Sequence, residues 1–424
     1  MAENTKTTSR FLEGLSIGAF FNRAQQMALV ILFPAIRDSL GLNYLSLAIL
    51  ETLRLVIQAV GDPLWKLATG RGNRKWLLAA CTGFWGIWTL GCGLAANFWQ
   101  LLIVRILACL GFGCLFPLAL DLLQDIFDSN DTARVMNALQ VSGMFGAVIM
   151  AIVLAELLNI TAIGWRYGFV ILGSLAILAG GAIAILVKNP SPPTTREGAM
   201  PGTPGEPGVW IRGQFQSLGE ILKRPTVWLH FLQGSLVTTT VNTLLIFSVT
   251  WLVDIKHMTQ IDAPFIFGGM LVFMAVGSQV GVWATNLAET RWPRIGRTAA
   301  TQAAMLLVLP FLYYLVLKAQ SLPVIMAAAI FVSFFLKWNQ SGLQKPQIEA
   351  IMPPELQSKA TFWIELVQAV FAAVAILGFS HYADNRNLTA MLRVLGIDFW
   401  GAALILTTAY YFFIPAELRR LPLE

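Results

Sequence analysis

Residues 98–124 read FWQLLIVRILACLGFGCLFPLALDLLQ, and this stretch decides the class of fold. It exceeds the roughly 20 apolar residues that an α-helix needs to cross a hydrocarbon core about 30 Å thick. Only Arg105 and Asp121 interrupt it with a formal charge. The stretch therefore predicts a transmembrane helix.

The rest of the chain repeats this pattern. Its 424 residues are 56% hydrophobic and 12% charged, whereas soluble domains average roughly a quarter charged residues. We expect an all-α membrane protein with twelve transmembrane helices in two pseudo-symmetric six-helix bundles. The predicted helices lie near residues 12–36, 44–68, 76–96, 98–124, 137–159, 167–187, 226–253, 263–286, 298–317, 322–344, 360–380 and 396–415.

The longest polar interruption separates the two predicted bundles. Residues 189–208 read NPSPPTTREGAMPGTPGEPG, a composition typical of a flexible linker. Apolar residues then recur at helical spacing through Ile211, Phe215, Leu218 and Leu222, which predicts an interfacial helix. The predicted organisation is an N-terminal bundle at 1–190, a cytoplasmic linker at 191–225 and a C-terminal bundle at 226–424.

The distribution of basic residues predicts the orientation. Most of the 29 lysines and arginines fall in the alternate loops that share a side with both termini. Cytoplasmic loops carry such an excess, so we expect both termini in the cytoplasm. The compact loops and the absence of a targeting extension favour a bacterial inner membrane, and we expect a monomer.

Catalytic and metal signatures are missing from the sequence. The four cysteines lie inside apolar runs and the three histidines are scattered, so no metal site or cofactor is expected. Neither G-x-S-x-G, nor H-E-x-x-H, nor a phosphate-binding G-x-x-x-x-G-K-S/T loop occurs. We therefore expect no enzyme, no direct use of ATP and no nucleic-acid partner.

A basic loop carries the first of four patterns that resemble a known family. Residues 66–75 read KLATGRGNRK and resemble the G-x-L-A-D-R-x-G/N-R-K motif between helices 2 and 3 of the major facilitator superfamily. The resemblance implies a gating role for Arg71, Arg74 and Lys75. The aspartate of the motif is absent, which puts the charge relay of that gate in doubt.

The other three patterns lie in the expected order along the N-terminal half. Arg105 with Cys109, Gly111 and Gly113 resembles the family's R-x-x-x-G-x-G-x-G. Residues 164–169, GWRYGF, resemble its G-W-R-W-x-F, and Asn22-Arg23 with residues 34–36 and 40–42 resembles a run found in organic-anion and Spinster-like members. The resemblance covers essentially the whole chain and implies a secondary transporter.

Charged residues inside the predicted helices are the main candidates for a site. A charge at the bilayer centre costs at least about 2.5–3.5 kcal/mol, so it persists where it faces water, a partner or a ligand. Such residues are Arg23, Glu51, Arg54, Arg105, Lys337 and Glu365. The four cations exceed the two anions, which favours an anionic substrate.

Each of these charges has two interpretations. We expect Arg23, Arg105 and Lys337 to bind substrate, although structural pairing, structural hydrogen bonding and snorkelling to the interface are the respective alternatives. Glu51 and Arg54 are three apart and so form either an ion pair or part of the site. Glu365 is the first candidate for proton coupling, unless it pairs permanently with Lys337.

Neutral polar residues on the same helices complete the predicted substrate site. They are Asn22, Gln26, Asn242, Asn339 and Gln340.

The leading hypothesis is alternating-access transport of a small organic anion, with proton symport left open. A transporter of lysolipids or other amphiphiles and a multidrug exporter are the alternatives within the transport class. A membrane sensor that keeps the fold but moves nothing is the alternative from another class.

Overall fold

The computed structural model describes residues 2–69, 74–124, 127, 129–160, 163–186, 207–385 and 387–419. Within these ranges the chain forms helices and no β-strands. Twelve of the helical segments are long and apolar enough to cross a membrane, which confirms the predicted number. Contacts along the chain divide it into two compact units.

The first unit comprises Met1–Leu42, Ile57–Val209 and Gln260–Gly268. Its helices are α1 (Ala2–Leu40), α3 (Arg74–Ala79), α4 (Trp85–Leu94), α5 (Phe98–Phe112), α6 (Leu115–Gln124), α7 (Ser129–Ile160), α8 (Gly164–Leu186) and the π-helical η1 (Ala80–Phe84). Helix α2 (Tyr44–Thr69) begins in the second unit and continues into the first.

The second unit comprises Asn43–Val56, Trp210–Thr259 and Gly269–Glu424. Its helices are α9 (Pro207–Ile221), α10 (Pro225–Asp254), α11 (Asp262–Arg291), α12 (Gly296–Leu317), α13 (Leu322–Phe335), η2 (Asn339–Gln344), α14 (Lys345–Ile351), α15 (Pro354–Asn385), α16 (Leu388–Leu392), η3 (Arg393–Asp398), α17 (Phe399–Thr407) and α18 (Tyr410–Leu418). The first residues of α9 and of α11 belong to the first unit. Helix α9 contains Ile211, Phe215 and Leu218 of the predicted apolar stripe and ends one residue before Leu222.

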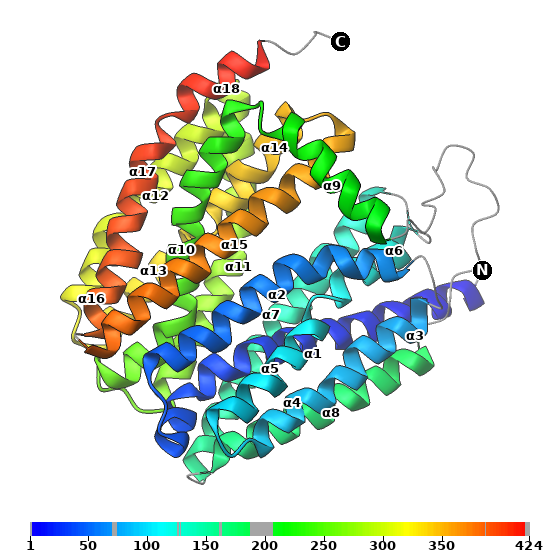
Figure 1. Ribbon diagram of the computed structural model, residues 1–424, viewed down its shortest axis with the longest axis vertical. Helices are drawn as coiled ribbons and strands as arrows, with labels where there is room; N and C mark the ends of the chain where they lie inside the picture. The colour runs from blue at the N-terminus through cyan, green and yellow to red at the C-terminus, as the bar shows by residue number, and fades with distance from the viewer. Residues whose placement is uncertain are drawn as a thin grey trace. The chain divides into compact units, whose positions relative to one another are not determined.

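Close helix packing orders the interior of the first unit. Helix α1 packs against α7 and α8, and α4 lies alongside α8 (Figure 1). A Cβ atom added at Gly146 of α7 would collide with the carbonyl oxygen of Phe20 in α1. Small residues thus let the two backbones approach, as is common between transmembrane helices.

The second unit contains a similar close approach. Helix α10 packs against α15 and α17, and α12 packs against α13. A Cβ atom added at Gly277 of α11 would collide with the carbonyl oxygen of Phe334 in α13. Each unit therefore depends on at least one glycine at a helix contact.

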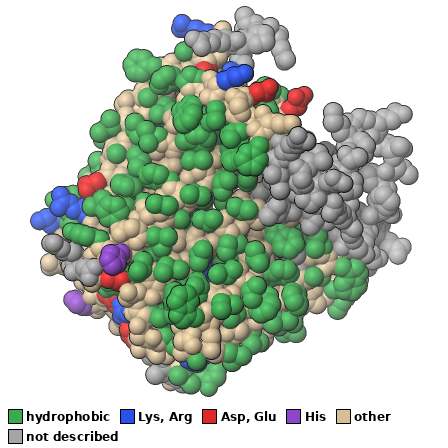
Figure 2. Space-filling view, viewed as in Figure 1, with side chains coloured by type: hydrophobic (Ala, Val, Ile, Leu, Met, Phe, Trp, Pro, Cys, Tyr) green, Lys and Arg blue, Asp and Glu red, His purple; other side chains and the backbone are tan. Residues whose placement is uncertain are grey.

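Apolar side chains cover the outside of the molecule. Figure 2 shows hydrophobic side chains spread across one face, with most of the charged ones at its edges. The side chains of Ile185, Ile405 and Phe412 are 80%, 71% and 76% exposed. A soluble monomer rarely exposes such contiguous apolar area, whereas a lipid bilayer covers it.

Several predicted helix boundaries differ from the structure. The membrane span of α1 begins at Phe11, close to the predicted residue 12, but polar residues extend the helix itself to Ala2. Helix α7 begins at Ser129 rather than near residue 137. The last span begins at Leu388 rather than near residue 396. Arg393 lies before the predicted last helix, but it begins the helical segment η3.

Candidate functional site

Six polar residues from three helices of the first unit lie together in its interior. This arginine cluster consists of Asn22, Arg23, Gln25 and Gln26 of α1, Thr89 of α4 and Arg105 of α5. Positions 22, 25 and 26 share one face of a helix because they are three and four residues apart. That spacing turns a row of amides on α1 toward α4 and α5.

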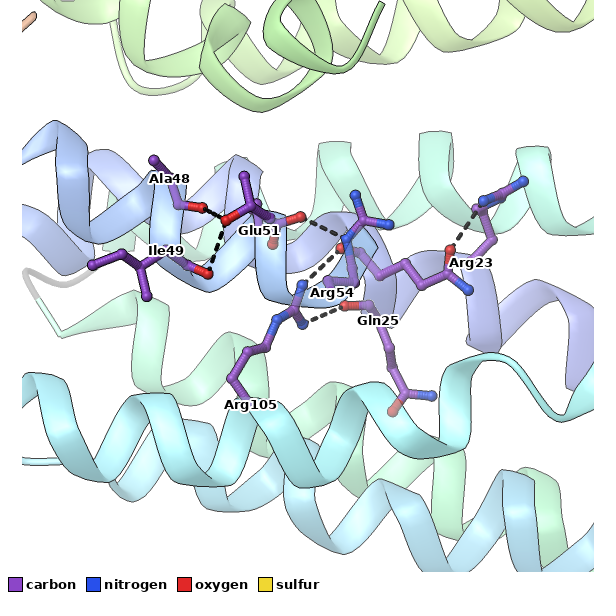
Figure 3. Close-up of polar contacts among 9 residues, drawn as sticks. Arg23, Gln25, Ala48, Ile49, Glu51, Arg54 and Arg105 are labelled. Carbon is purple, nitrogen blue, oxygen red and sulfur yellow. Dashed lines mark hydrogen bonds and ion pairs between the residues drawn. The ribbon is translucent and has the colours of Figure 1, made fainter. Parts of the chain in front are cut away.

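Arg105 holds α5 to the backbone of α1. Its side chain is only 2% exposed. The two terminal nitrogens donate to the carbonyl oxygens of Gln25 at 3.4 Å and Gln26 at 3.1 Å (Figure 3). The guanidinium carbon also lies 5.4 Å from the ring centroid of Phe112, within the range of a cation–π interaction.

A chain of hydrogen bonds runs along α1 away from these carbonyls. Arg23 donates to the side-chain oxygen of Gln26 at 2.9 Å, and Gln26 donates to Asn22 at 2.8 Å. Asn22 in turn donates to the carbonyl oxygen of Phe112 at 3.1 Å. The two amides are buried, whereas Arg23 is half-buried and retains access from outside the cluster.

Gln25 connects the same cluster to α4. The Thr89 hydroxyl donates to the side-chain oxygen of Gln25 at 2.6 Å, and both residues are buried. The amide nitrogen of Gln25 donates to the Phe21 carbonyl one turn earlier. Because its side chain is held at both ends, Gln25 positions α1 rather than offering groups to a ligand.

Glu51 and Arg54 form an ion pair within α2. The Arg54 Nε and a Glu51 carboxylate oxygen are 2.6 Å apart, and the side chains are 8% and 0% exposed (Figure 3). The spacing of three residues places both groups on one face of the helix. Pairing lowers the cost of keeping two charges in an apolar span.

The second unit contains a buried network made mostly of neutral groups. This amide network consists of His230 and Gln233 of α10, Asn339 and Gln344 of η2, Gln368 of α15, Thr407 of α17 and Tyr410 of α18. All seven side chains are buried. The network therefore joins five helical elements of the second unit.

Gln233 lies at its centre. It exchanges two hydrogen bonds with Asn339, at 3.0 and 3.2 Å, and donates to the Thr407 hydroxyl at 3.2 Å. The Tyr410 hydroxyl lies 2.8 Å from His230 Nδ1 and donates to Gln233 at 3.4 Å. Asn339 therefore faces the interior of the unit, and its predicted role in substrate binding gains no support from these contacts.

Lys337 and Gln340 are hydrogen-bonded to each other beside the start of η2. The Lys337 ammonium donates to the side-chain oxygen of Gln340 at 2.9 Å, and both residues are half-buried. Glu365 is also half-buried. Asn242 is half-buried too, and it donates to the Thr238 carbonyl of its own helix at 2.9 Å.

Three family-like patterns have visible structural roles. Arg166 of α8 donates to the carbonyl oxygens of Gly93 and Ala95 at the end of α4, at 3.0 and 2.7 Å. A Cβ atom at Gly111 would collide with the Trp85 side chain. Gly41, with a φ of 64°, adopts the left-handed conformation that ends α1.

The basic loop cannot be described in the same detail. Arg71 lies outside the described residues, and so do the side chains of Arg74 and Lys75. In the described parts of the chain, no three His, Cys, Asp or Glu side chains approach closely enough to hold a metal ion.

Several members of the arginine cluster and of the amide network were not predicted from the sequence. Thr89, Gln344, Thr407 and Tyr410 were not predicted, although each takes part in a buried hydrogen bond. Single hydroxyls and amides on apolar helices give a weak signal, because Thr also satisfies itself on its own helix. Their partners are visible only once the helices are packed.

Comparisons with known proteins fit this architecture. The chain is 25% identical over 185 residues to the "Probable L-galactonate transporter" of Escherichia coli (strain K12), covering 43% of this chain and 40% of that protein. It is 28% identical over 141 residues to the "Probable 4-methylmuconolactone transporter" of Cupriavidus pinatubonensis (strain JMP 134 / LMG 1197), covering 32% of this chain and 33% of that protein. The matches thus span less than half of either relative.

The structural comparison covers nearly the whole chain. The crystal structure of a bacterial homolog of the human lysosomal transporter Spinster, in an inward-facing and occupied conformation, matches with a TM-score of 0.75. The match covers 98% of this chain and 97% of the other at 16% identity, and therefore shows a shared fold. The family model of the Major Facilitator Superfamily matches residues 15–376, so this multi-pass membrane protein belongs to that superfamily of transporters.

Proposed function

We propose that the protein moves a small organic anion across the membrane by alternating access. The E. coli relative is named for L-galactonate, whose carboxylate is a small organic anion. A half-buried cation in each unit supports the same substrate class. This proposal goes further than family membership, which establishes a transporter without its cargo.

The two half-buried cations share a local arrangement, and this observation carries the proposal. Arg23 donates to Gln26 and Lys337 donates to Gln340, each glutamine lying three residues later on the same stretch of chain. Both cations remain partly exposed, whereas Arg105 is buried against carbonyl oxygens. The guanidinium fork of Arg23 matches the geometry of a carboxylate.

The remaining predicted residues take supporting roles in this proposal. Asn22 and Gln26 orient Arg23. Arg105 and Asn339 act through the packing of their units. Asn242 offers an amide to the substrate body. The Glu51–Arg54 pair stabilises α2. Arg71, Arg74 and Lys75 form the basic loop that we propose for gating.

Proton coupling is the second part of the proposal. Glu365 is a half-buried carboxylic acid in an apolar span, which supports it as the candidate for proton coupling. A carboxyl group that gains and loses a proton during the cycle would couple anion movement to protons. Uptake into liposomes should then rise with an inward proton gradient, and Glu365→Gln should abolish this dependence.

Ligand-dependent stability and uptake test the substrate class. Sugar acids such as aldonates should raise the thermal midpoint of the purified protein, because a ligand that binds only the folded state stabilises it by mass action. Neutral sugars of the same size serve as matched controls. Arg23→Gln should reduce anion uptake by roughly tenfold or more, and Arg23→Lys should restore part of it.

Other outcomes would separate the alternatives. Stabilisation by neutral or cationic drugs alone would favour a multidrug exporter, and stabilisation by lysolipids alone would favour an amphiphile transporter. Binding of an anion without any flux would favour a sensor. Equal transport of neutral and anionic analogues would contradict the anion proposal.

The orientation and assembly of the protein are also proposals. We propose that both termini face the cytoplasm of a bacterial inner membrane and that the protein works as a monomer. Labelling single cysteines in the loops from either side of the membrane would test the orientation, and its mass in detergent would test the monomer.

A further inference from the structure

A carboxylate from a distant part of the chain caps the start of α2. Asp384, at the end of α15, accepts hydrogen bonds from the backbone N–H groups of Tyr44 at 2.8 Å and Leu45 at 3.3 Å. The first N–H groups of a helix have no partner inside it, and the helix dipole favours a negative charge beside them. We call this contact between Asp384 and the two N–H groups the α2 cap.

A second carboxylate holds the same helix end. The Tyr44 hydroxyl donates to Asp254, at the end of α10, at 2.9 Å. Tyr44 begins one membrane span, whereas Asp254 and Asp384 end two others. Their contacts therefore lie at a membrane surface and not at bilayer depth. This surface is the outer one if both termini face the cytoplasm, as proposed above.

The helix begins here without help from Asp384. The Asn43 side-chain oxygen accepts from the N–H and the hydroxyl of Ser46, at 2.9 and 2.7 Å. Asparagine is among the most favourable residues for capping a helix locally. Asn43 therefore starts α2, whereas the α2 cap fixes the helix end against α15.

The division between the two units passes through α2. Residues Asn43–Val56 group with the second unit, and the helix from Ile57 onward groups with the first. In alternating access, the two halves of a transporter move against each other. One continuous helix cannot follow both, so either it bends or its contacts with one unit open. The α2 cap lies at the end of α2 that groups with the second unit.

The α2 cap has the exposure of a contact that opens and closes. Asp384 is exposed, so water replaces both hydrogen bonds when the helix end moves away. A comparable cap inside the second unit is closed to water. There Glu417 of α18 accepts from the N–H of Thr226 at the start of α10, at 3.3 Å, and Glu417 is only 4% exposed. Two caps of the same chemistry thus differ in their access to water.

We propose that the α2 cap is a releasable latch of the transport cycle. With the cap closed, as in this structure, the start of α2 stays with α15. With the cap open, the whole of α2 moves with the first unit. Asp384 is a positioning residue in this proposal, because it acts through the helix rather than on a substrate. The proposal rests on the alternating access proposed above, and it is independent of the substrate class.

Cysteine labelling measures the opening without any substrate. Leu47 lies one turn after the cap and is fully buried, so Leu47→Cys reports when this end of α2 separates. The variant is made with the four native cysteines replaced by alanine, and its labelling in nanodiscs by a membrane-impermeant maleimide is timed. Asp384→Ala should speed the labelling roughly fivefold, the expected effect of losing a helix cap. Asp384→Glu should keep the labelling close to its starting rate.

Two variants separate opening from general destabilisation. Asp131→Ala removes an exposed carboxylate from the first turn of α7, so it matches Asp384→Ala in charge and exposure. Glu417→Gln removes the charge from the cap inside the second unit. It should lower the thermal midpoint, whereas neither variant should speed the labelling of Leu47→Cys.

A reversible tether tests whether the cap has to open during transport. Leu45→Cys combined with Asp384→Cys, on the same cysteine-free background, is joined by a short bis-methanethiosulfonate reagent. Uptake of a sugar acid into liposomes should fall to background and return after dithiothreitol cleaves the tether. Each single-cysteine variant, treated in the same way, should keep its uptake.

Three results would overturn the latch. One is unchanged labelling in Asp384→Ala. Another is equally fast labelling in Asp131→Ala or Glu417→Gln, which would mean that any loss of charge loosens α2. The third is undiminished uptake by the tethered protein. If the untethered protein takes up no anion, the proposed substrate class fails, and the labelling alone decides the latch.

Discussion

The two units organise their buried polar groups differently. In the first unit, the guanidinium of Arg105 binds backbone carbonyls of α1. In the second, Gln233 and Asn339 exchange neutral hydrogen bonds between α10 and η2. A buried charge has only a few acceptable arrangements, whereas an amide pair can be replaced jointly by apolar residues. We therefore expect the first unit to be the less tolerant of substitution.

The largest effect should come from Arg105→Leu. Loss of two hydrogen bonds to a charged donor should lower the free energy of unfolding by about 3 kcal/mol. Arg105→Lys should retain only part of this stability, because an ammonium cannot reproduce the guanidinium fork. Unfolding in detergent, followed by the fluorescence of the buried tryptophans, measures the change.

A surface arginine provides the control for that experiment. Arg134 is 82% exposed and lies 3.4 Å from Asp131, so Arg134→Leu should change stability little. Equal stability of Arg105→Leu and Arg134→Leu would mean that the arginine cluster does not stabilise the first unit. Arg105 would then be retained for a role in transport.

The amide pair of the second unit should show an intermediate effect. Gln233→Leu or Asn339→Leu alone leaves a buried amide without its partner and should cost about 1–2 kcal/mol. The double variant should cost clearly less than the sum of the two. Strict additivity would show that the two amides act independently and would remove the contrast between the units.

The smallest effect should come from Thr89→Val in the first unit. It removes the 2.6 Å hydrogen bond to Gln25 and should cost about 0.5–1 kcal/mol. Thr52→Val is the matched control, because the Thr52 hydroxyl bonds the Ala48 carbonyl of its own helix. Indistinguishable midpoints for the two variants would show that the link between α1 and α4 contributes nothing measurable.

Much of the fold could be predicted from hydropathy alone. A span must bury its backbone hydrogen bonds in an apolar segment of defined length, and twelve such segments are visible in the sequence. The boundaries were less predictable. The predicted last helix began near residue 396 and left out Arg393, because a charge beside an apolar run resembles a loop in the sequence.

The candidate site was predictable only in part. Charges in apolar spans are conspicuous, so Arg23, Arg105 and Lys337 could be identified from the sequence. The direction in which Arg105 points depends on how α5 packs against α1, and no local pattern encodes it. Hydroxyl partners such as Tyr410 also escaped prediction, because many similar residues on these helices have no buried contact.

The π-helical segment η2 has a consequence for how the chain tolerates deletions. A π turn holds one residue more than an α turn would over the same length. Deleting one residue among Asn339–Gln344 should let the segment close into an α-helix with both flanks still in register. The same deletion inside α10 would rotate every later side chain by about 100°. Related sequences should therefore accept an alignment gap at η2 more readily than in α10.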